Sequence, residues 1–432
     1  MSLLLRQTDL TPDVPRLARA LSVAPGAQLL WSGGVEARSS YLCCDPVAYS
    51  AALDPEPGLP LRPELGPEAG CPRWVGALPY ECRRGLERRS AGPDPRPAPH
   101  FVRPAWQRYA AVARVDAQGV TLVGESVAAL DRLHARLREA QPAPRGAPET
   151  VRLERVSDSA DTPRQHIERV QRALDLIARG ELYQVNLARR FSYHVQGGAI
   201  QLLLALASHD SAPYASALNL GDQGVVGMSP ELCLRVEPSG QLSTTPIKGT
   251  RPRGADATLD AQLALELDQD PKERAELAMI LDVERNDLGR VAATGSVRLT
   301  GGPEVVSHPT IHHRQATLVA QLRPGVSRAA LLEAMLPSGS VTGAPKIRAM
   351  DLIAELEPVR RGLYTGAYGY LSHAGGLELA MAIRSLSVKQ GVGHYHTGGG
   401  IVADSDPGRE LEETEWKAAQ FEALARTSAK LR

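Results

Sequence analysis

Two long runs with the composition of β-strands follow one another closely in the middle of this chain and constrain its fold most strongly. GVVGMSPELCLRVEP occupies residues 224–238, and QLSTTPIKGT occupies residues 241–250. Further strand-like runs, QLLWSGG, RYAAVARVD and VTLVGES, stand in the first third of the sequence, and we see no internal repeat. Long strands of this antiparallel type with dispersed helices are typical of an α+β protein.

Proline-rich segments divide the chain. RRSAGPDPRPAPHFVRP, residues 88–104, is expected to be an exposed loop, and QPAPRGAPET, residues 141–150, is expected to be a linker. Residues 163–190 look helical and lead into the strand-like run ELYQVNLARRFSY. We therefore divide the chain into two regions, residues 1–150 and residues 151–432.

One helix can be placed by its capping residues in DQDPKERAELAMILDVERNDLGR. Asp270 is a good N-cap, Pro271 suits the first helical position, and Glu273 stands where a capping partner should. Gly289 is expected to end this helix.

A second helix is expected to open at Asp406 and Pro407 in DSDPGRELEETEWKAAQFEALAR. Its spacing puts Glu410, Glu413 and Lys417 on one face. Acids of both helices could converge on a hard divalent cation such as Mg²⁺, or could simply complement the helix dipole at the surface. The candidate metal ligands are Glu276, Glu410 and Glu413.

Composition limits the compartment and the partners. Lys and Arg together number 49, as do Asp and Glu, so no global field attracts nucleic acid or an anionic membrane. The start, MSLLLRQTDLTPDV, has too short an apolar run for a signal peptide, and no run is long enough to span a membrane. An odd number of cysteines without metal-ligand spacing indicates a reducing compartment, so we expect a cytoplasmic protein; they are Cys43, Cys44, Cys71, Cys82 and Cys233.

A lysine stands in an unusual context in TTPIKGTRPRG, residues 244–254. The residues around Lys248 predict a strand end running into a tight turn. The side chain could extend to solvent, or a confined lysine could lose its proton and act as a nucleophile.

Other candidates are weaker when taken singly. The run Gly398–Gly400 would let backbone N–H groups approach an anion, but it lacks dinucleotide-binding spacing. Arg384, in an apolar strand, should pair with an anion. Glu231, at the start of an apolar strand, could have a raised pKa and act as an acid. The remaining candidates, each of which could equally be structural, are Tyr364, His312 and His313.

Taken together, these segments resemble the chorismate-utilising enzymes: anthranilate synthase large subunits, isochorismate and salicylate synthases, and aminodeoxychorismate synthase component I. The motifs run in the family's order over about residues 160 to 425: GELYQVNLAR, GMSPELCLRV, PIKGTRPRG, AELAMILDVERNDLGR, GSVTGAPKIRAMDLI, YTGAYGYL, AIRSL and GGGIVADSDPGRELEETEWKA. The N-terminal LLWSGGVEARSSYLCCDP resembles the region shared by the anthranilate and aminodeoxychorismate branches.

Two positions separate the branches by resemblance. Anthranilate synthases have PIAGT where this chain has PIKGT, and aminodeoxychorismate synthases carry the lysine, here Lys248. Isochorismate and salicylate synthases have a water-activating lysine at the position of Gln184, and glutamine cannot act as that base. The aminodeoxychorismate branch is therefore favoured. An anthranilate synthase large subunit and a non-catalytic tryptophan-binding subunit of the same fold are the alternatives.

The resemblance also implies a mechanism. Mg²⁺ on the three glutamates would bind the ring carboxylate of chorismate, neutral Lys248 would attack C2, and Glu231 would protonate the departing C4 hydroxyl. Ammonia, supplied by a glutamine amidotransferase partner, would then attack C4 and expel the lysine. The substrate-binding residues implied are Gln184, Thr250, His313, Ser340, Tyr364, Arg384, Gly398, Gly399, Gly400 and Lys417.

The implied fold has two large antiparallel sheets packed as a sandwich, with helices outside. In this family the N-terminal part often forms a tryptophan pocket, and the sequence leaves open whether tryptophan occupies it here. The matching positions are Ser32, Ser39, Ser40, Tyr41, Pro213, Tyr214 and Ala215.

Overall fold

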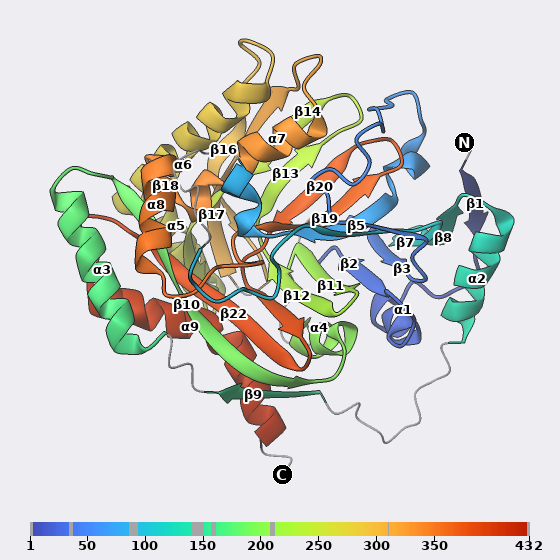
Figure 1. Ribbon diagram of the computed structural model, residues 1–432, viewed down its shortest axis with the longest axis horizontal. Coiled ribbons are helices and arrows are strands. Elements are labelled where there is room, and N and C mark those ends of the chain that lie inside the picture. The colour runs from blue at the N-terminus through green and yellow to red at the C-terminus, as the bar shows by residue number, and fades with distance from the viewer. Residues whose placement is uncertain are drawn as a thin grey trace.

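The protein is built on two large antiparallel sheets (Figure 1). The computed structural model describes residues 3–33, 38–85, 94–139, 151–156, 161–207, 212–309 and 311–429. The larger sheet has 12 strands. In spatial order they are β1 (Leu4–Gln7), β8 (Gly119–Gly124), β7 (Ala111–Asp116), β3 (Ser40–Cys43), β2 (Gln28–Trp31), β11 (Tyr214–Leu220), β12 (Gln223–Ser229), β21 (Ser385–Lys389), β22 (Val392–Ile401), β10 (Gln184–Gln196) and β18 (Gly343–Ala344), with β9 (Arg152–Val156) also paired to β10.

The second sheet has 10 strands. They are β15 (Ile247–Pro252), β17 (Ile311–Gln321), β14 (Gln241–Thr245), β13 (Leu232–Val236), β20 (Leu377–Met381), β19 (Ala367–Ser372), β5 (Pro72–Leu78), β6 (Ala105–Arg108) and β4 (Ala48–Ser50), with β16 (Arg298–Ser307) also paired to β17. A cluster of buried side chains from both sheets, including Val75, Tyr109, Val225 and Ala380, fills the space between them. The predicted α+β sandwich is confirmed.

Helices cover the outside of the sheets. They are α1 (Val14–Leu21), α2 (Val127–Arg138), α3 (Pro163–Ala178), α4 (Ala199–Ala207), α5 (Ala257–Gln269), α6 (Pro271–Val291), α7 (Arg328–Met335), α8 (Lys346–Leu356) and α9 (Pro407–Ala429), with short 3₁₀ turns η1 (Pro67–Gly70), η2 (Tyr80–Gly85) and η3 (Gly339–Val341). Figure 1 shows α3, α8 and α9 at one end of the molecule and α1 and α2 at the other. Strands from residues 1–150 and from residues 151–432 share both sheets, so this division does not separate two hydrophobic cores.

The capping signals place both expected helices. Asp270 accepts hydrogen bonds from the backbone N–H groups of Lys272 and Glu273, at 2.9 and 3.2 Å, and α6 follows. Asp406 accepts one from the Arg409 N–H at 2.9 Å as α9 begins. These caps satisfy N–H groups that have no partner within the helix.

Three local expectations need correction or lie outside the description. The helix expected over 163–190 ends at Ala178, because Gly180 adopts a left-handed φ of 76° that stops it, and β10 begins at Gln184. Gly289 does not end α6, which continues so that Val291 packs in the core. The linker expected at 141–150 lies outside the described residues.

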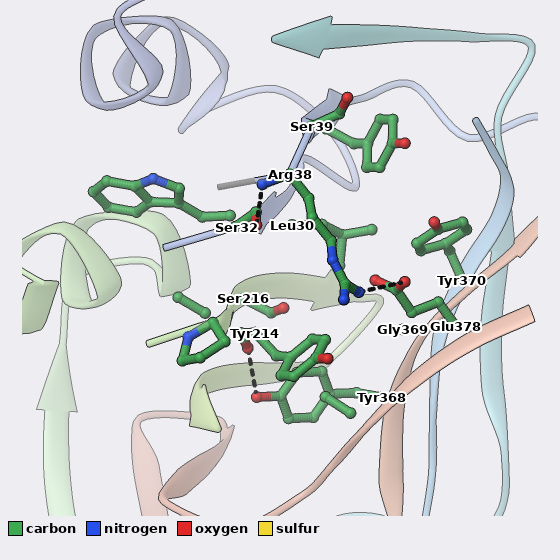
Figure 2. Close-up of a pocket in the computed structure, with 15 residues that line it drawn as sticks. Leu30, Ser32, Arg38, Ser39, Tyr214, Ser216, Tyr368, Gly369, Tyr370 and Glu378 are labelled. Carbon is green, nitrogen blue, oxygen red and sulfur yellow. Dashed lines mark hydrogen bonds and ion pairs between the residues drawn. The ribbon is translucent and has the colours of Figure 1, made fainter. Parts of the chain in front are cut away.

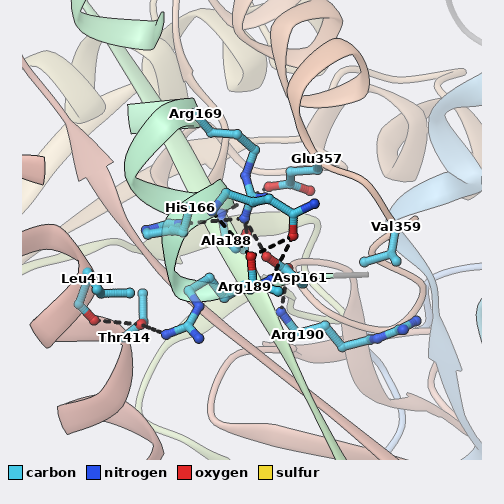
Figure 3. Close-up of polar contacts among 12 residues, drawn as sticks. Asp161, His166, Arg169, Ala188, Arg189, Arg190, Glu357, Val359, Leu411 and Thr414 are labelled. Carbon is cyan, nitrogen blue, oxygen red and sulfur yellow. Dashed lines mark hydrogen bonds and ion pairs between the residues drawn. The ribbon is translucent and has the colours of Figure 1, made fainter. Parts of the chain in front are cut away.

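Buried polar groups fix β10, which contributes a wall of the candidate site (Figure 3). Asp161 accepts from the Arg169 guanidinium at 2.6 Å and from the Arg190 N–H at 2.9 Å. Glu357 accepts from the Ala188 N–H at 3.0 Å. Arg189 donates to Thr414 at 3.0 Å. Together these contacts tie the strand to α3, α9 and the segment after α8, so its inner face is held in one position.

Candidate active site

A cavity of about 340 Å³ gathers most of the predicted site residues. It lies among β10, β22 and β15 and the helices α6 and α9. The predicted residues that line it are Glu231, Lys248, Thr250, Glu276, His313, Ser340, Tyr364, Arg384, Gly398, Gly399, Gly400, Glu410, Glu413 and Lys417. Gln184 does not line the cavity but packs against Gly400, where an added Cβ would lie 2.2 Å from the Gln184 amide nitrogen and 3.6 Å from Lys248 Nζ.

Lys248 lies at a bulge, and not at a strand end before a tight turn as its context had suggested. Ile247 pairs with Gln315 and Thr250 pairs with His313, so β15 has one extra residue relative to β17. Gly249 takes the left-handed φ of 82° that such a bulge requires. Because a bulge changes where neighbouring side chains point, it accounts for an ammonium that lines the cavity from within a strand.

Glu231 lines the cavity and is buried, with only 4% of its surface exposed. Its carboxylate accepts a hydrogen bond from the Ser340 hydroxyl at 2.7 Å. Burial raises the pKa of Glu231 to about 7, while the Ser340 hydrogen bond and the charge of Lys248 oppose the increase. A carboxyl of this kind can hold a proton near neutral pH and donate it to a leaving group.

Three further carboxylates predicted from the sequence, Glu276, Glu410 and Glu413, line the same cavity. Burial raises the pKa of Glu276. The positive charge of Lys248 opposes this increase, and the negative charge of the nearby Glu413 adds to it. Burial and Glu413 likewise raise the pKa of Glu410, although a Ser405 hydrogen bond at 2.7 Å opposes this. Mutual repulsion between buried acids is relieved when a cation binds, and carboxylate oxygens are the ligands that Mg²⁺ prefers.

The carboxylates of Glu276, Glu410 and Glu413 do not form a preformed metal-coordination site. Glu413 forms an ion pair with Lys417 at 2.5 Å, as the helical spacing allows. Over the described ranges, no group of three or more His, Cys, Asp or Glu side chains is close enough to hold a metal ion. The chemistry of the donors suits Mg²⁺, and Glu413 would have to exchange Lys417 for the ion.

The glycine run at the end of β22 and two basic side chains, Arg384 and Lys417, line the same cavity as the acids. β21 pairs with β22 only as far as Tyr395, whereas Gly398–Gly400 pair with β10, so alternate backbone groups of these glycines have no strand partner in the described part of the chain. Lys417 donates to the Gly398 carbonyl at 2.8 Å. Arg384 lines the same cavity with a left-handed φ of 48°, a strained conformation of the kind found at binding sites.

Two predicted residues are coupled to each other at this wall. The Thr250 hydroxyl and the His313 Nδ1 lie 2.9 Å apart. Burial and the charge of Arg384 lower the pKa of His313 to about 3, so this imidazole is neutral near pH 7. His312 points elsewhere and contacts Asp260 through Nε2 at 3.0 Å.

The cavity also contains residues that the sequence reasoning missed. Glu273 had been assigned as a capping partner, but its carboxylate lines the cavity 3.6 Å from Arg251. Its spacing of three residues from Glu276 was a usable signal, because such positions share a helix face. The other missed residues with polar or aromatic side chains are Asn186, Arg251, Lys272, Tyr395, His396, Thr397 and Trp416.

Several buried polar atoms around this cavity have no partner among the described residues. They include Gln184 Oε1, Asn186 Oδ1 and His396 Nε2. Buried polar atoms are nearly always hydrogen-bonded, so each exception needs an explanation. A polar ligand in the cavity would satisfy groups that face it.

A sequence model of the chorismate binding enzyme family matches residues 40–423. The chain belongs to this family. Over 89% of its length and 80% of the relative's, it is 37% identical to anthranilate synthase component 1 of Pseudomonas aeruginosa. Over 54% of its length and 52% of the relative's, it is 44% identical to aminodeoxychorismate synthase component 1 of Klebsiella aerogenes.

Solved structures agree with this membership. The crystal structure of anthranilate synthase component I from Streptococcus pneumoniae superimposes with a TM-score of 0.75 at 30% sequence identity, covering 89% of this chain and 92% of that one. The match supports a chorismate-converting enzyme built on this two-sheet fold. None of the described helices combines the length and apolar character needed to cross a membrane.

A second cavity in this chorismate-binding enzyme lies between the two sheets where β2, β11, β19 and β20 meet (Figure 2). It is lined by six of the seven residues predicted for a tryptophan pocket: Ser32, Ser39, Tyr41, Pro213, Tyr214 and Ala215. Ser40 is not in the lining but accepts from the Ser32 N–H at 3.1 Å.

Arg38 crosses this second cavity (Figure 2), with its guanidinium 3.5 Å from Glu378. The free space is about 60 Å³. An engineered cavity of about 150 Å³ is what a benzene ring occupies. An indole would therefore need Arg38 to move.

Proposed function

We propose that this chain is an aminodeoxychorismate synthase component I, which converts chorismate and ammonia to 4-amino-4-deoxychorismate for para-aminobenzoate and folate synthesis. The observation that carries the proposal is Lys248, which lines the same cavity as the buried acid Glu231. An amine and a proton-holding carboxyl beside one substrate can perform two successive allylic displacements, whereas an acid alone supports only direct amination.

Lys248 would be the nucleophile. The neutral amine attacks C2 of chorismate, the ring double bonds shift, and the C4 hydroxyl leaves as water with the proton of Glu231. Ammonia then attacks C4 and expels the lysine, so the new amine stands at C4. Direct attack of ammonia at C2 would give the anthranilate pattern instead. The position of the nitrogen thus reports whether Lys248 participates covalently.

The remaining residues would bind and orient the substrate. Arg384, Tyr364 and the backbone N–H groups of Gly398–Gly400 would hold the enolpyruvyl carboxylate, and Thr250, Ser340 and the neutral His313 would line the ring. Lys417 would neutralise charge near the acids, and Gln184 would pack against Gly400 on the same side as Lys248. A cavity lined by both basic and acidic side chains suits a substrate with two carboxylates that shares the cavity with a cation.

Mg²⁺ would be held by Glu276, Glu410 and Glu413. When bound, it would supply positive charge for the ring carboxylate of chorismate and link substrate affinity to metal affinity. Glu273 offers a fourth carboxylate from the same helix as Glu276. The chain's own task at this side of the cavity is to present these acids and to open the contact between Glu413 and Lys417.

Ammonia would come from a separate glutamine amidotransferase subunit. Cys233, the cysteine that follows Glu231, is buried, and burial raises its thiol pKa well above the ordinary value, which does not suit a glutaminase nucleophile. We therefore expect the purified chain to use ammonium at high pH but to use glutamine only after a partner subunit is added. Robust glutamine-dependent turnover by the single chain would contradict this.

An anthranilate synthase component I is the second candidate. It is favoured by the Pseudomonas aeruginosa relative of that name, which aligns over 89% of this chain. A non-catalytic tryptophan-binding subunit is a weaker alternative, since it gives no reason for the lysine, the acid and the carboxylates to share one cavity.

The deciding experiment is an assay of the purified chain with chorismate, Mg²⁺ and ammonium, with products separated by chromatography. The proposal expects 4-amino-4-deoxychorismate. Without ammonia, chorismate and Mg²⁺ should leave an adduct on the peptide that contains Lys248. Fluorescent anthranilate as the main product would assign the chain to the other branch, and no chorismate turnover would favour the non-catalytic subunit.

A further inference from the structure

A second buried carboxyl stands behind Glu231, outside the cavity. Glu284, on α6, is fully buried at 0% exposure and does not line the cavity. Nothing in the proposed displacements uses it. A carboxyl at such a place is costly in its charged form, so it needs either a close partner or a retained proton.

Hydrogen bonds join this carboxyl to the proposed acid. The Ser340 hydroxyl donates to Glu231 Oε1 at 2.7 Å. The Ser340 and Ser338 hydroxyl oxygens lie 2.9 Å apart, and either one can donate. The Ser338 hydroxyl in turn contacts Glu284 Oε1 at very short range. The path Glu231–Ser340–Ser338–Glu284 is therefore an unbroken chain of proton-exchanging groups, all of them buried.

The surroundings of Glu284 keep a proton available. From η3, the Gly339 N–H donates to Oε1 at 2.9 Å, while Oε2 has no partner among the described residues. From its own helix, Asp287 places a second buried carboxylate nearby, and this one is paired with Lys346 of α8 at 2.7 Å. Burial and the charge of Asp287 raise the pKa of Glu284, whereas Lys346 opposes the increase.

The other groups that face Glu284 do not neutralise it. β13 begins directly after Glu231 and presents Cys233, whose thiol pKa is raised well above its ordinary value by burial and by Glu284. Lys346, the cation whose charge acts on Glu284, is engaged with Asp287. Glu284 and Glu231 thus have comparable reasons to hold a proton, which is the condition for exchanging one along the hydroxyls.

We propose that Glu284 sets the protonation of Glu231 through the Ser338–Ser340 hydroxyl pair, so that the acid exchanges its proton with the protein interior while substrate fills the cavity. Glu284 acts through other residues and is a positioning residue for the acid. This inference rests on the proposed acid role of Glu231. It does not depend on which branch of the family the chain represents, because the C4 hydroxyl leaves in both.

The proton balance closes. When Glu231 gives its proton to the departing oxygen, the Ser340 hydroxyl passes its own proton to Glu231 and takes that of Ser338, which takes that of Glu284. Both hydroxyls end as they began. When ammonia becomes the bound amine, it releases one proton, which returns along the same path. Chorismate loses a hydroxyl and gains an amine, water leaves, and the proton from ammonia replaces the one that left with the water, so that both carboxyls are protonated again.

The test compares Ser338→Ala, which interrupts the path, with Ser338→Thr, which keeps a hydroxyl. In Ser338→Ala, we expect kcat for chorismate conversion to fall about tenfold with KM nearly unchanged, and then to rise with the concentration of a small weak acid such as formic acid. Ser338→Thr should retain most of the wild-type kcat, and its kcat should not depend on the concentration of the added acid. Glu284→Gln, which keeps size and hydrogen bonding but cannot pass a proton, should behave like Ser338→Ala.

A matched control on the same helix is Asp282→Asn, an exposed site where the same charge is removed. It should leave kcat and its pH profile unchanged. Ser338→Ala and Glu284→Gln with wild-type kcat, pH profile and no rescue by formic acid would overturn the relay. So would an equal loss in Ser338→Thr and Ser338→Ala, which indicates packing alone. Product identity is scored separately by chromatography, so a wrong branch assignment cannot be mistaken for failure of the relay.

Discussion

The two cavities between the sheets differ in how their polar groups are satisfied. The larger cavity is lined by five carboxylates, three lysines and two arginines, and buried amide and imidazole atoms around it have no protein partner among the described residues. In the smaller one, Arg38 reaches Glu378, Glu378 also accepts from Arg235 at 2.8 Å, and the Tyr368 hydroxyl donates to the Tyr214 carbonyl at 2.9 Å. The larger cavity has polar groups that a ligand would satisfy, and the smaller cavity is largely filled by its own side chains.

The two cavities show that a lining that matches the family does not by itself make a cavity ready to bind a ligand. The same fold provides both cavities, and the sequence predicts the lining of both. Among the described residues, only the larger is surrounded by buried polar atoms that have no hydrogen-bond partner. It also gathers three carboxyls with raised pKa values, whereas the smaller has one, Glu378, whose pKa burial likewise raises. Variants of each cavity can therefore test whether unsatisfied groups mark function, from the largest expected effect to the smallest.

The largest effect is expected for Lys248→Ala. Removing the nucleophile should lower the rate of 4-amino product formation on the order of a thousandfold, equivalent to about 4 kcal/mol of barrier. The Lys248 adduct should disappear, and residual amination should move from C4 to C2. Chromatography of the products, with mass analysis of the peptide, measures both effects.

Lys248→Arg is the informative control for that variant. It keeps the positive charge, but a guanidinium stays protonated and cannot attack carbon. It should therefore fail to restore the 4-amino product. If Lys248→Ala or Lys248→Arg makes that product at nearly the wild-type rate, the lysine is only a positive wall of the cavity.

A smaller loss, on the order of a hundredfold, is expected for Glu413→Gln. The change removes one negative charge with little change in shape, so Mg²⁺ affinity and chorismate affinity should weaken together. Activity measured against Mg²⁺ concentration, and in excess EDTA, checks this. Glu412→Gln, at the exposed neighbouring position of α9, should leave activity intact. Full activity in Glu413→Gln or in EDTA would return these acids to an ordinary solvated helix face.

The same burial that prepares the acid should cost stability as the pH rises. An unfolded glutamate has a pKa of about 4.3, and that of Glu231 is about 7 in the folded protein. The folded state therefore binds more protons between these values, so its stability is fully present below the unfolded pKa and falls as the pH rises towards 7. Glu231→Gln should thus be more stable than the wild type by up to about 3 kcal/mol at pH 8, with no gain at pH 4.

Thermal melts of both proteins from pH 4 to pH 8 measure this difference. Glu412→Gln, which replaces an exposed acid, should follow the wild type throughout. A melting difference between Glu231→Gln and the wild type that is the same at every pH would show that the folded pKa of Glu231 is not raised.

Much of the structure could be predicted from rules that depend on neighbouring residues in the sequence. Asp270 and Asp406 mark helix starts because capping depends on neighbouring residues, and the two-sheet fold followed from motifs in a fixed order. Gly180 was overlooked although it lies inside the segment taken as helical, and its left-handed conformation is what ends α3. Glu273 was read by the local capping rule, whereas its carboxylate faces a cavity formed by distant strands.

The rest depends on contacts between residues far apart in the chain. The bulge that places Lys248 is defined only by the register of β15 against β17. Glu284 accepts a hydrogen bond from the Ser338 hydroxyl, although the two residues are 54 positions apart in the sequence. Arg38 meets Glu378 across the space between the sheets, and no periodicity within either segment marks that pair. Pairings of this kind are set by tertiary packing, and single-sequence patterns do not contain them.

The smallest effect is expected for Arg38→Ala in the filled cavity. Its ion pair with Glu378 is 3.5 Å long and 40% of the Arg38 side chain is exposed, so the pair is worth at most about 1 kcal/mol. Glu378 keeps Arg235 and is not left without a cation. Chorismate turnover should be unchanged, and tryptophan, which must otherwise displace Arg38, should bind up to about fivefold more tightly by calorimetry.

Arg164→Ala, which removes an arginine that is 89% exposed, should change neither quantity. If Arg38→Ala leaves tryptophan affinity unaltered, Arg38 does not compete for this cavity; if turnover falls as well, the two cavities are coupled and the contrast between them fails.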